Sequence, residues 1–293
     1  MIARRGSRRT WELLFALFVG VVHAAVIAGI VARLDYPVKT FEYVPGGVPG
    51  ATVGLVAVVA IPVFIVLRYR IVLPILAAIA GAVWPVYQEF TTPPPEFSTL
   101  GGYTIIHGTR YVDAYVNGWY VWLLAYLLVG LAEYVVRSDH EWLPSPARTE
   151  RLEQWTRRDH LAALRLATVV AVAHVAVFLL LAADSGYFAP DGFLPSPWYV
   201  GLGVLAWTVL GLLVVGGLPM YLLVRTRLVA PIVVFAWLVR ETGWAQNIPL
   251  PDDSLPVYFI GWFFFAGVLL VVGSVEYALR LAGQWTGHRP TTG

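Results

Sequence analysis

Long runs of apolar residues dominate this sequence and constrain what it can fold into. Hydrophobic residues make up 58% of the 293 positions and charged residues only 13%, about half the charged share of an ordinary soluble domain. The runs are long enough for helices of about 20 residues, the length that crosses the hydrocarbon core of a bilayer. The composition therefore predicts a membrane protein.

The apolar windows predict eight transmembrane helices, at residues 11–33, 50–68, 71–88, 115–137, 160–182, 197–218, 228–244 and 255–281. In hydrocarbon every backbone N–H and C=O group must be paired within the protein. The runs also lack the alternation of apolar and polar residues typical of barrel strands. The expected fold class is an all-α integral membrane protein.

The charged residues predict an orientation for these eight helices. With eight spans both termini and loops 2–3, 4–5 and 6–7 lie on one side, and that side carries most of the arginines: Arg4, Arg5, Arg8, Arg9, Arg68, Arg70, Arg137, Arg148, Arg151, Arg157, Arg158, Arg225, Arg227, Arg280 and Arg289. The opposite side carries only Arg33, Lys39, Arg110 and Arg240, among many acids. The protein is expected in the plasma membrane. By the positive-inside rule, both termini are expected on its cytoplasmic side.

Three sequence matches in the same order indicate an internal repeat. Residues 118–137 match 261–280 at an offset of 143, and the Pro and Arg-x-Arg pattern of 62–75 matches 219–232 at an offset of 157. A shorter match pairs 22–26 with 173–177 at an offset of 151. The chain is thus predicted to contain two four-helix repeats.

The repeats divide the chain into residues 1–137, a cytoplasmic linker at 138–159 with a short interfacial helix, and residues 160–293. Because four helices is an even number, both repeats have the same orientation in the membrane. We expect them to be related by a pseudo-twofold axis along the membrane normal. The outer loop 89–114 is longer than its counterpart, and a gain of function in one repeat is expected there.

Two histidines lie at matching depths in the first and fifth predicted helices. Polar side chains within the membrane face the protein interior and are functional candidates. If His23 and His174 faced each other across the axis, they would ligate a haem b iron from both sides. The simpler interpretation is that each ring bonds to a neighbouring helix, and no cofactor is predicted on that interpretation.

Ionic side chains gather at the predicted cytoplasmic helix ends. Each repeat has a Glu and Arg four residues apart in the favourable order, a helix-stabilising pair, and an Arg-x-Arg turn. The residues are Glu133, Arg137, Glu276, Arg280, Arg68, Arg70, Arg225 and Arg227. They predict a basic rim for anionic lipid headgroups or another membrane subunit, with plain stabilisation of the helix ends as the alternative.

Pro62 and Pro219 fall inside predicted helices at an offset of 157. A proline within a helix lacks the N–H that would bond the carbonyl four residues earlier, so both helices are expected to kink. Kinks can line a cavity, although packing alone explains many prolines in membrane helices.

Many activities lack their residues in this sequence. There is no cysteine for a disulfide or thiolate metal site, and the only lysine, Lys39, is in a predicted loop. Zinc, serine-hydrolase and phosphate-loop motifs are absent, and the basic residues follow membrane topology and not a nucleic-acid surface. The use of arginine in place of lysine resembles halophilic archaeal membrane proteins.

Three hypotheses of function remain. The preferred one is a non-catalytic membrane subunit or scaffold that contacts the lipid bilayer, anionic headgroups or other membrane subunits. The second is a transporter of a small or apolar substrate through the interface between the repeats. The third is a haem- or quinone-binding electron-transfer subunit.

Overall fold

A computed structural model of the chain describes residues 2–34, 47–100, 103–139, 153–154, 156–157, 159–184, 198–245 and 258–287. The helices and strands in chain order are α1 (Ile2–Leu34), α2 (Gly47–Tyr69), α3 (Leu73–Thr91), β1 (Glu96–Leu100), β2 (Tyr103–His107), α4 (Tyr111–Asn117), α5 (Trp119–Asp139), α7 (His160–Asp184), α8 (Trp198–Thr226), α9 (Ala230–Ala245) and α11 (Trp262–Gly287). Most of the predicted linker 138–159 lies outside the described residues.

Seven of these helices are long and apolar enough to cross a membrane, namely α1, α2, α3, α5, α7, α8 and α11. The chain is therefore a multi-pass membrane protein, and its membrane helices contact the lipid bilayer. The eighth predicted span, 228–244, corresponds to α9, which has 16 residues. At 1.5 Å per residue α9 is about 24 Å long, shorter than a typical hydrocarbon core.

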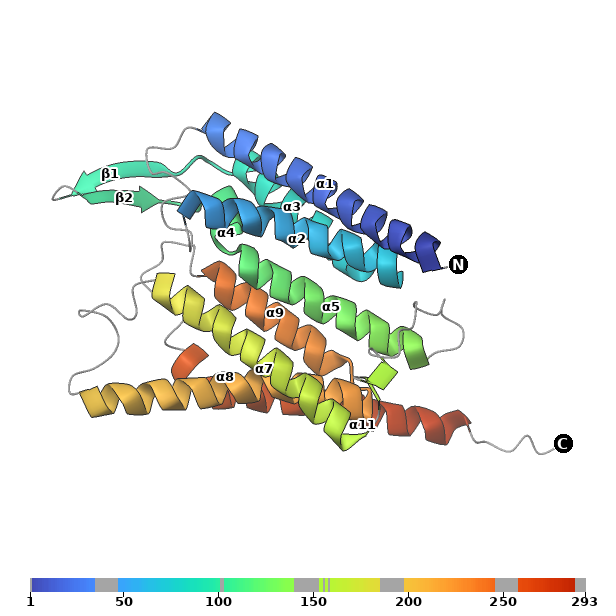
Figure 1. Ribbon diagram of the computed structural model, residues 1–293. Helices are drawn as coiled ribbons and strands as arrows, with labels where there is room; N and C mark the ends of the chain where they lie inside the picture. Colours follow the sequence, from blue (N-terminus) through green and yellow to red (C-terminus); the bar gives the residue numbers. More distant parts are fainter. Residues whose placement is uncertain are drawn as a thin grey trace.

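The segment 89–114, predicted as an outer loop, contains a β-hairpin that was not expected. β1 and β2 pair as an antiparallel hairpin in which Glu96 lies opposite His107. The hairpin extends past the ends of α1, α2 and α3, at the end of the molecule opposite the beginning of α1 (Figure 1). The next predicted helix, 115–137, is divided at Gly118 into α4 and α5.

Two apolar cores hold the helices together, and α5 belongs to both. One side of α5, with Trp122 and Tyr126, completes a core with α1, α2, α3 and α4. Its other side, with Val121 and Leu128, completes the core of α7, α8, α9 and α11. α5 accordingly lies in the middle of the molecule, beside α9 (Figure 1).

The packing of the two halves differs from the predicted pseudo-twofold relation. A twofold axis that places α5 against α9 would also place α11 against α3. Within the described part of the chain, α3 and α11 have no contact comparable to that of α5 with α9. The prediction was wrong because equal orientation of two units defines the direction of an axis, and leaves the angle of rotation about it undetermined.

Candidate functional site

His23 of α1 bonds to two other segments of the first half. Its Nδ1 lies 2.9 Å from the Leu55 carbonyl oxygen of α2, and its Nε2 lies 3.1 Å from the Tyr115 hydroxyl of α4. Because a carbonyl only accepts, Nδ1 carries the hydrogen, and Nε2 of the neutral ring accepts from Tyr115. One imidazole thus joins three helices.

His174 of α7 makes the same pair of bonds in the second half. Its Nδ1 donates to the Leu212 carbonyl oxygen of α8 at 2.8 Å, and its Nε2 accepts from the Tyr258 hydroxyl at 3.0 Å. The ring is fully buried against Phe178 and Phe235, with centroid distances of 4.8 Å and 5.0 Å.

The partners of the two histidines differ by the offsets found in the sequence. His23 and His174 differ by 151 positions, Leu55 and Leu212 by 157, and Tyr115 and Tyr258 by 143. Each ring uses both nitrogens within its own half, so neither nitrogen remains for a haem iron. This geometry favours the interpretation that each histidine bonds to neighbouring helices.

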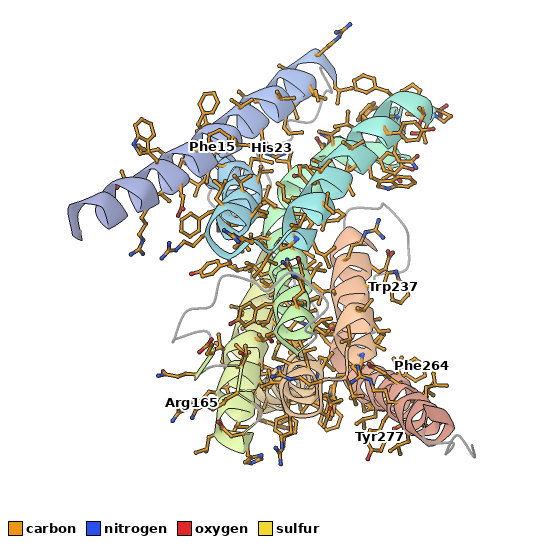
Figure 2. The ribbon with its side chains drawn as sticks, turned by 90° about the vertical axis from the view of Figure 1, so that its right-hand side faces the viewer. Phe15, His23, Arg165, Trp237, Phe264 and Tyr277 are labelled. Atoms are coloured by element: carbon orange, nitrogen blue, oxygen red, sulfur yellow. The ribbon has the colours of Figure 1, made fainter. Side chains whose placement is uncertain are left out.

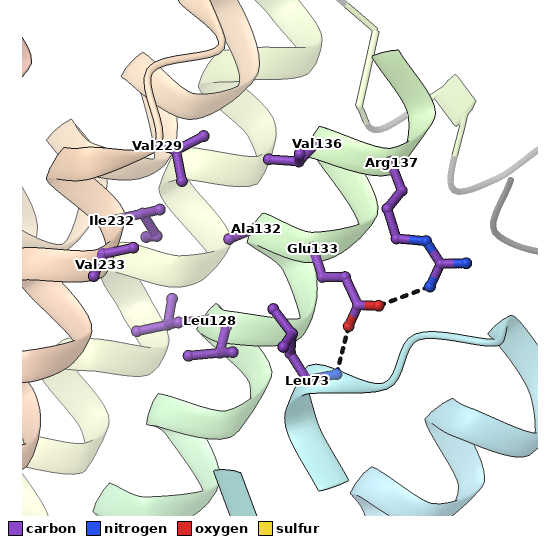
Figure 3. A pocket seen from close by; sticks show the side chains of 10 residues that line it. Leu73, Leu128, Ala132, Glu133, Val136, Arg137, Val229, Ile232 and Val233 are labelled. Atoms are coloured by element: carbon purple, nitrogen blue, oxygen red, sulfur yellow. Dashed lines mark hydrogen bonds and ion pairs between the residues drawn. The ribbon is translucent and has the colours of Figure 1, made fainter. Parts of the chain in front are cut away.

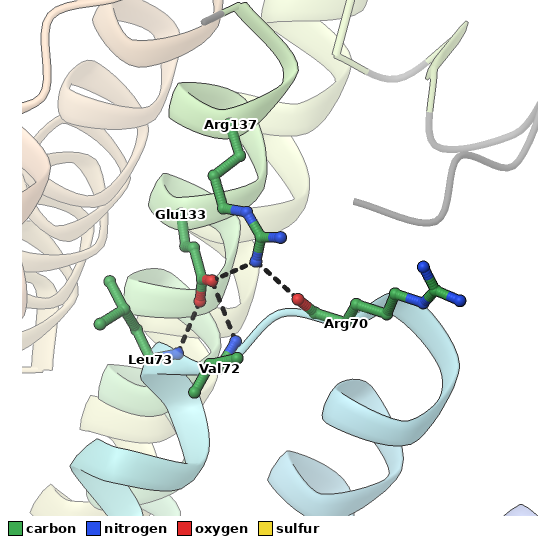
Figure 4. Close-up of polar contacts among 5 residues, drawn as sticks. All are labelled: Arg70, Val72, Leu73, Glu133 and Arg137. Atoms are coloured by element: carbon green, nitrogen blue, oxygen red, sulfur yellow. Dashed lines mark hydrogen bonds and ion pairs between the residues drawn. The ribbon is translucent and has the colours of Figure 1, made fainter. Parts of the chain in front are cut away.

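Glu133, near the end of α5, caps the beginning of α3. Its two carboxylate oxygens accept hydrogen bonds from the backbone N–H groups of Val72 and Leu73, at 3.0 Å and 2.6 Å (Figure 4). Arg137 donates to the same carboxylate at 2.7 Å and to the Arg70 carbonyl oxygen at 2.6 Å. The first N–H groups of a helix have no partner within it, and here a carboxylate of another helix supplies one.

Glu276 of α11 caps α9 in the same way. It accepts from the N–H groups of Val229 and Ala230 at 3.0 Å and 2.7 Å, and Arg280 pairs with it. This second site is more open to solvent, since 43% of the Arg280 side chain is exposed against 13% for Arg137. Sequence reasoning identified both ion pairs and missed the capping.

A signal for this capping exists in the sequence. The N-cap residue of α3 is Val72, which has no polar side chain to accept the free N–H groups, and Val229 precedes α9 in the same way. Ser, Thr, Asp and Asn are the usual residues at such positions. An uncapped helix start in a membrane protein thus predicts an acceptor from elsewhere in the chain.

The Arg-x-Arg turns place their second arginine in an unusual backbone conformation. Arg70 and Arg227 have φ values of 59° and 61°, and their N–H groups bond to the carbonyl oxygens of Val66 and Leu223. These are left-handed C-caps, which end α2 and α8. The side chain of Arg227 also donates to the Thr156 carbonyl oxygen at 3.0 Å.

The first arginines of the two turns, Arg68 and Arg225, are exposed at the ends of α2 and α8. Arg68 lies 3.9 Å from Glu12 of α1. The two turns follow the ends of α2 and α8, and both helices end on the side of the molecule where α1 begins and α11 ends (Figure 1).

Pro62 and Pro219 lie within α2 and α8, and both helices continue past them. The carbonyls that each proline leaves without a helical partner belong to Val58 and Val215, both fully buried residues. The predicted kinks stay a prediction.

An apolar groove runs along α5 between α3 and α9. Its first part, about 360 Å³, is lined by Leu73, Leu128, Ala132, Ile232 and Val233 among others, with Glu133 and Arg137 at its edge (Figure 3). A second part of about 480 Å³ continues past Val129 and Val233 to Trp84, Trp122, Trp237 and Arg240. Charged side chains thus occur only toward its two ends.

Two glycines that sequence reasoning did not single out let tryptophans pack against helices. A Cβ atom at Gly54 would overlap the Trp119 ring, and one at Gly211 would overlap the Trp262 ring. The glycines differ by 157 positions and the tryptophans by 143, the offsets seen at the histidine sites.

No family model, no curated protein and no solved structure matches this chain. Among the described residues, no group of three or more His, Asp or Glu side chains is placed to hold a metal ion.

Proposed function

We propose that this chain is a non-catalytic membrane subunit, built from two four-helix repeats, that binds a partner protein through its basic rim. We define the rim as Arg68, Arg70, Arg225 and Arg227. The observation that carries the proposal is the use of the polar side chains inside the helices. Each of these polar side chains bonds one helix to another, namely His23, His174, Glu133 and Glu276. Such structural use of polar groups is expected of a scaffold.

The duplication has support from contacts that recur at the three offsets. The histidine bonds, the glutamate caps, the left-handed arginines and the glycine–tryptophan contacts each occur once in each half. In this proposal residues 1–137 and 160–293 are the repeats, 138–159 is the linker, and α9 is the eighth span. The beginning of α1 and the end of α11 lie at the same end of the molecule (Figure 1), an arrangement that supports an even number of crossings.

The proposed orientation places that end, with the basic rim, in the cytoplasm of a cell whose plasma membrane holds the protein. The support is the excess of arginine on this side. Anionic lipid headgroups and acidic segments of other subunits are the chemistry that such a rim attracts.

Purification from native membranes in a mild detergent tests the proposal. We expect a second membrane protein to copurify in near-equal amount, and the double variant Arg70→Gln, Arg225→Gln to lose most of it. The matched control is Arg33→Gln, an exposed arginine at the opposite end of α1. Recovery of the unaltered chain without a partner would contradict the proposal. So would equal recovery of a partner by the unaltered chain, the double variant and the Arg33→Gln control.

The groove favours a second candidate, movement of a lipid, most of which is apolar, along the interface between the halves. It lies where helices of both halves meet, and its lining between the charged ends is apolar. In vesicles we would measure the transfer of a fluorescent phospholipid between leaflets. Ala77→Phe, in the groove, should slow transfer severalfold, whereas Leu76→Phe, exposed on α3 outside the groove, should not. Transfer no faster than in protein-free vesicles would remove this candidate.

A further inference from the structure

The joint between the two halves uses two different surfaces. α5, the last helix of the first half, packs against α9, the third membrane helix of the second half. The positional counterparts are α11 for α5, at an offset of 143, and α3 for α9, at an offset of 157. The joint is therefore head to tail, and each chain keeps one unused copy of each surface.

Side-chain exposure shows that the counterpart surface on α11 is uncovered. Val121 and Leu128 of α5 are 3% and 2% exposed, whereas Phe264 and Val271 at the same positions of α11 are 65% and 63% exposed. Figure 2 shows Phe264 on the outside of α11. The α11 face, which we define as Phe264, Val271 and Val275, repeats the apolar character of the covered face of α5.

The surface on α3 shows the same contrast. α9 buries two rows of side chains. Phe235, which contacts His174 of the same half, and Leu238 form one row, and Ile232, Ala236 and Val239 form a second buried row beside them. At the counterpart positions of the second row, Ile79 is 54% exposed, whereas Ile75 and Ala82 are half-buried because they also pack against the core of the first half. These three residues are the α3 face.

We propose that the α11 face of one copy packs against the α3 face of a second copy, repeating between chains the joint that α5 and α9 form within one. The proposal goes beyond the proposed function and rests on the duplication stated there. A head-to-tail contact of this kind joins two or more chains, as a closed ring or as a row of copies according to the rotation between the halves.

The α3 face and the groove lie on different sides of α3. At 100° per residue, Ile75, Ile79 and Ala82 are far around the helix from Ala77 and Trp84, which line the groove. A second copy can therefore bind the α3 face and leave the groove open. Each contact between chains would form a further groove of the same kind.

Cysteine cross-linking tests this packing directly, because the native chain has no cysteine. The test variant carries Ile75→Cys and Val271→Cys, the counterparts of Ile232 and Leu128, which line the same pocket at the internal joint. On oxidation in native membranes we expect most of the protein to run as species of two or more chains, each of 32.3 kDa. Reduction should return them to one chain.

Two further variants separate the causes of failure. Leu76→Cys with Leu270→Cys is the matched control: both residues are exposed, and so are their counterparts Val233 and Leu127, so it should cross-link at least fivefold less. Leu128→Cys with Ile232→Cys should form a disulfide within one chain and so tests the α5–α9 joint. If this internal bond forms while the test variant stays one chain, or cross-links no more than the control, the second-copy contact is refuted. If the internal bond also fails to form, the α5–α9 joint is refuted and with it the second-copy contact that repeats it, whereas the duplication, which rests on contacts within each half, still stands.

Discussion

Replacing Glu133 with glutamine tests the capping of one membrane helix by a carboxylate of another. Glu133→Gln keeps the size of the side chain but removes its charge, and it turns one of two acceptor oxygens into an NH2 group that faces a backbone N–H. A hydrogen bond to a charged group contributes about 1.5–3 kcal/mol, and an unsatisfied buried donor costs about 1–3 kcal/mol. Because Arg137 also loses its ion pair with this carboxylate, we expect a loss of about 2–4 kcal/mol in the free energy of unfolding.

The second half supplies an internal comparison for this prediction. Glu276→Gln removes the same bonds, but the ion pair there is more exposed and solvent screens it more. We expect a smaller loss of about 1–2 kcal/mol. Glu241→Gln is the control, since Glu241 is a half-exposed partner of Arg240, and its loss should stay within about 0.5 kcal/mol.

The measurement is unfolding of the purified protein by titration of mixed micelles with dodecyl sulfate, followed by the fluorescence of its 12 tryptophans. The order of losses should be Glu133→Gln, then Glu276→Gln, then Glu241→Gln. If Glu133→Gln lowers the free energy of unfolding no more than Glu241→Gln does, the capping by Glu133 is refuted. If Glu276→Gln lowers it more than Glu133→Gln does, burial does not strengthen the Glu133 bonds as we expect.

Three further predictions concern packing and backbone conformation, each measured by the same unfolding titration. His174→Phe should lower the free energy of unfolding by about 2–4 kcal/mol, because it leaves the buried Tyr258 hydroxyl without its acceptor; in a double-mutant cycle with Tyr258→Phe the two losses should not add, and additive losses would disprove the bond. Gly211→Ala should cost about 1–3 kcal/mol because its Cβ atom meets the Trp262 ring, whereas Gly29→Ala, with open space around it, should be neutral or stabilising by up to about 1 kcal/mol; equal effects would contradict the close packing. Arg70→Val should cost about 1–2 kcal/mol because a β-branched residue tolerates a φ of 59° poorly, while Arg70→Gly should be close to neutral, and a loss for glycine as large as for valine would show that the arginine side chain is what matters.

The sequence predicted the membrane helices well because their signal is local. A long apolar run needs no knowledge of its neighbours, and seven of the eight predicted spans meet the length and hydropathy needed to cross a bilayer. The β1–β2 hairpin was not predicted because strands were excluded for segments within lipid, whereas the hairpin lies in a connection past the ends of α1, α2 and α3 (Figure 1).

The candidate sites were predicted as residues but not as contacts. His23 and His174 were singled out for their depth, yet their partners Tyr115 and Tyr258 lie 92 and 84 positions away along the chain. Glu133 was paired with Arg137 because four residues separate them on one helix, while its bonds to Val72 and Leu73 join distant segments. Spacing along one helix is readable in a single sequence, and contacts between helices are not.

The membership of α5 in both cores has a consequence for biosynthesis. When the ribosome has made residues up to Asp139, the side of α5 that carries Val121 and Leu128 faces lipid acyl chains. It stays in contact with lipid until α7, α8 and α9 are inserted. The amino-terminal half therefore folds in two stages, first around its own core and then against the second half. A carboxyl-terminal half expressed without α5 would lack the helix that completes its core. Splitting the gene between the halves should yield a stable protein only when both fragments are made in the same cell.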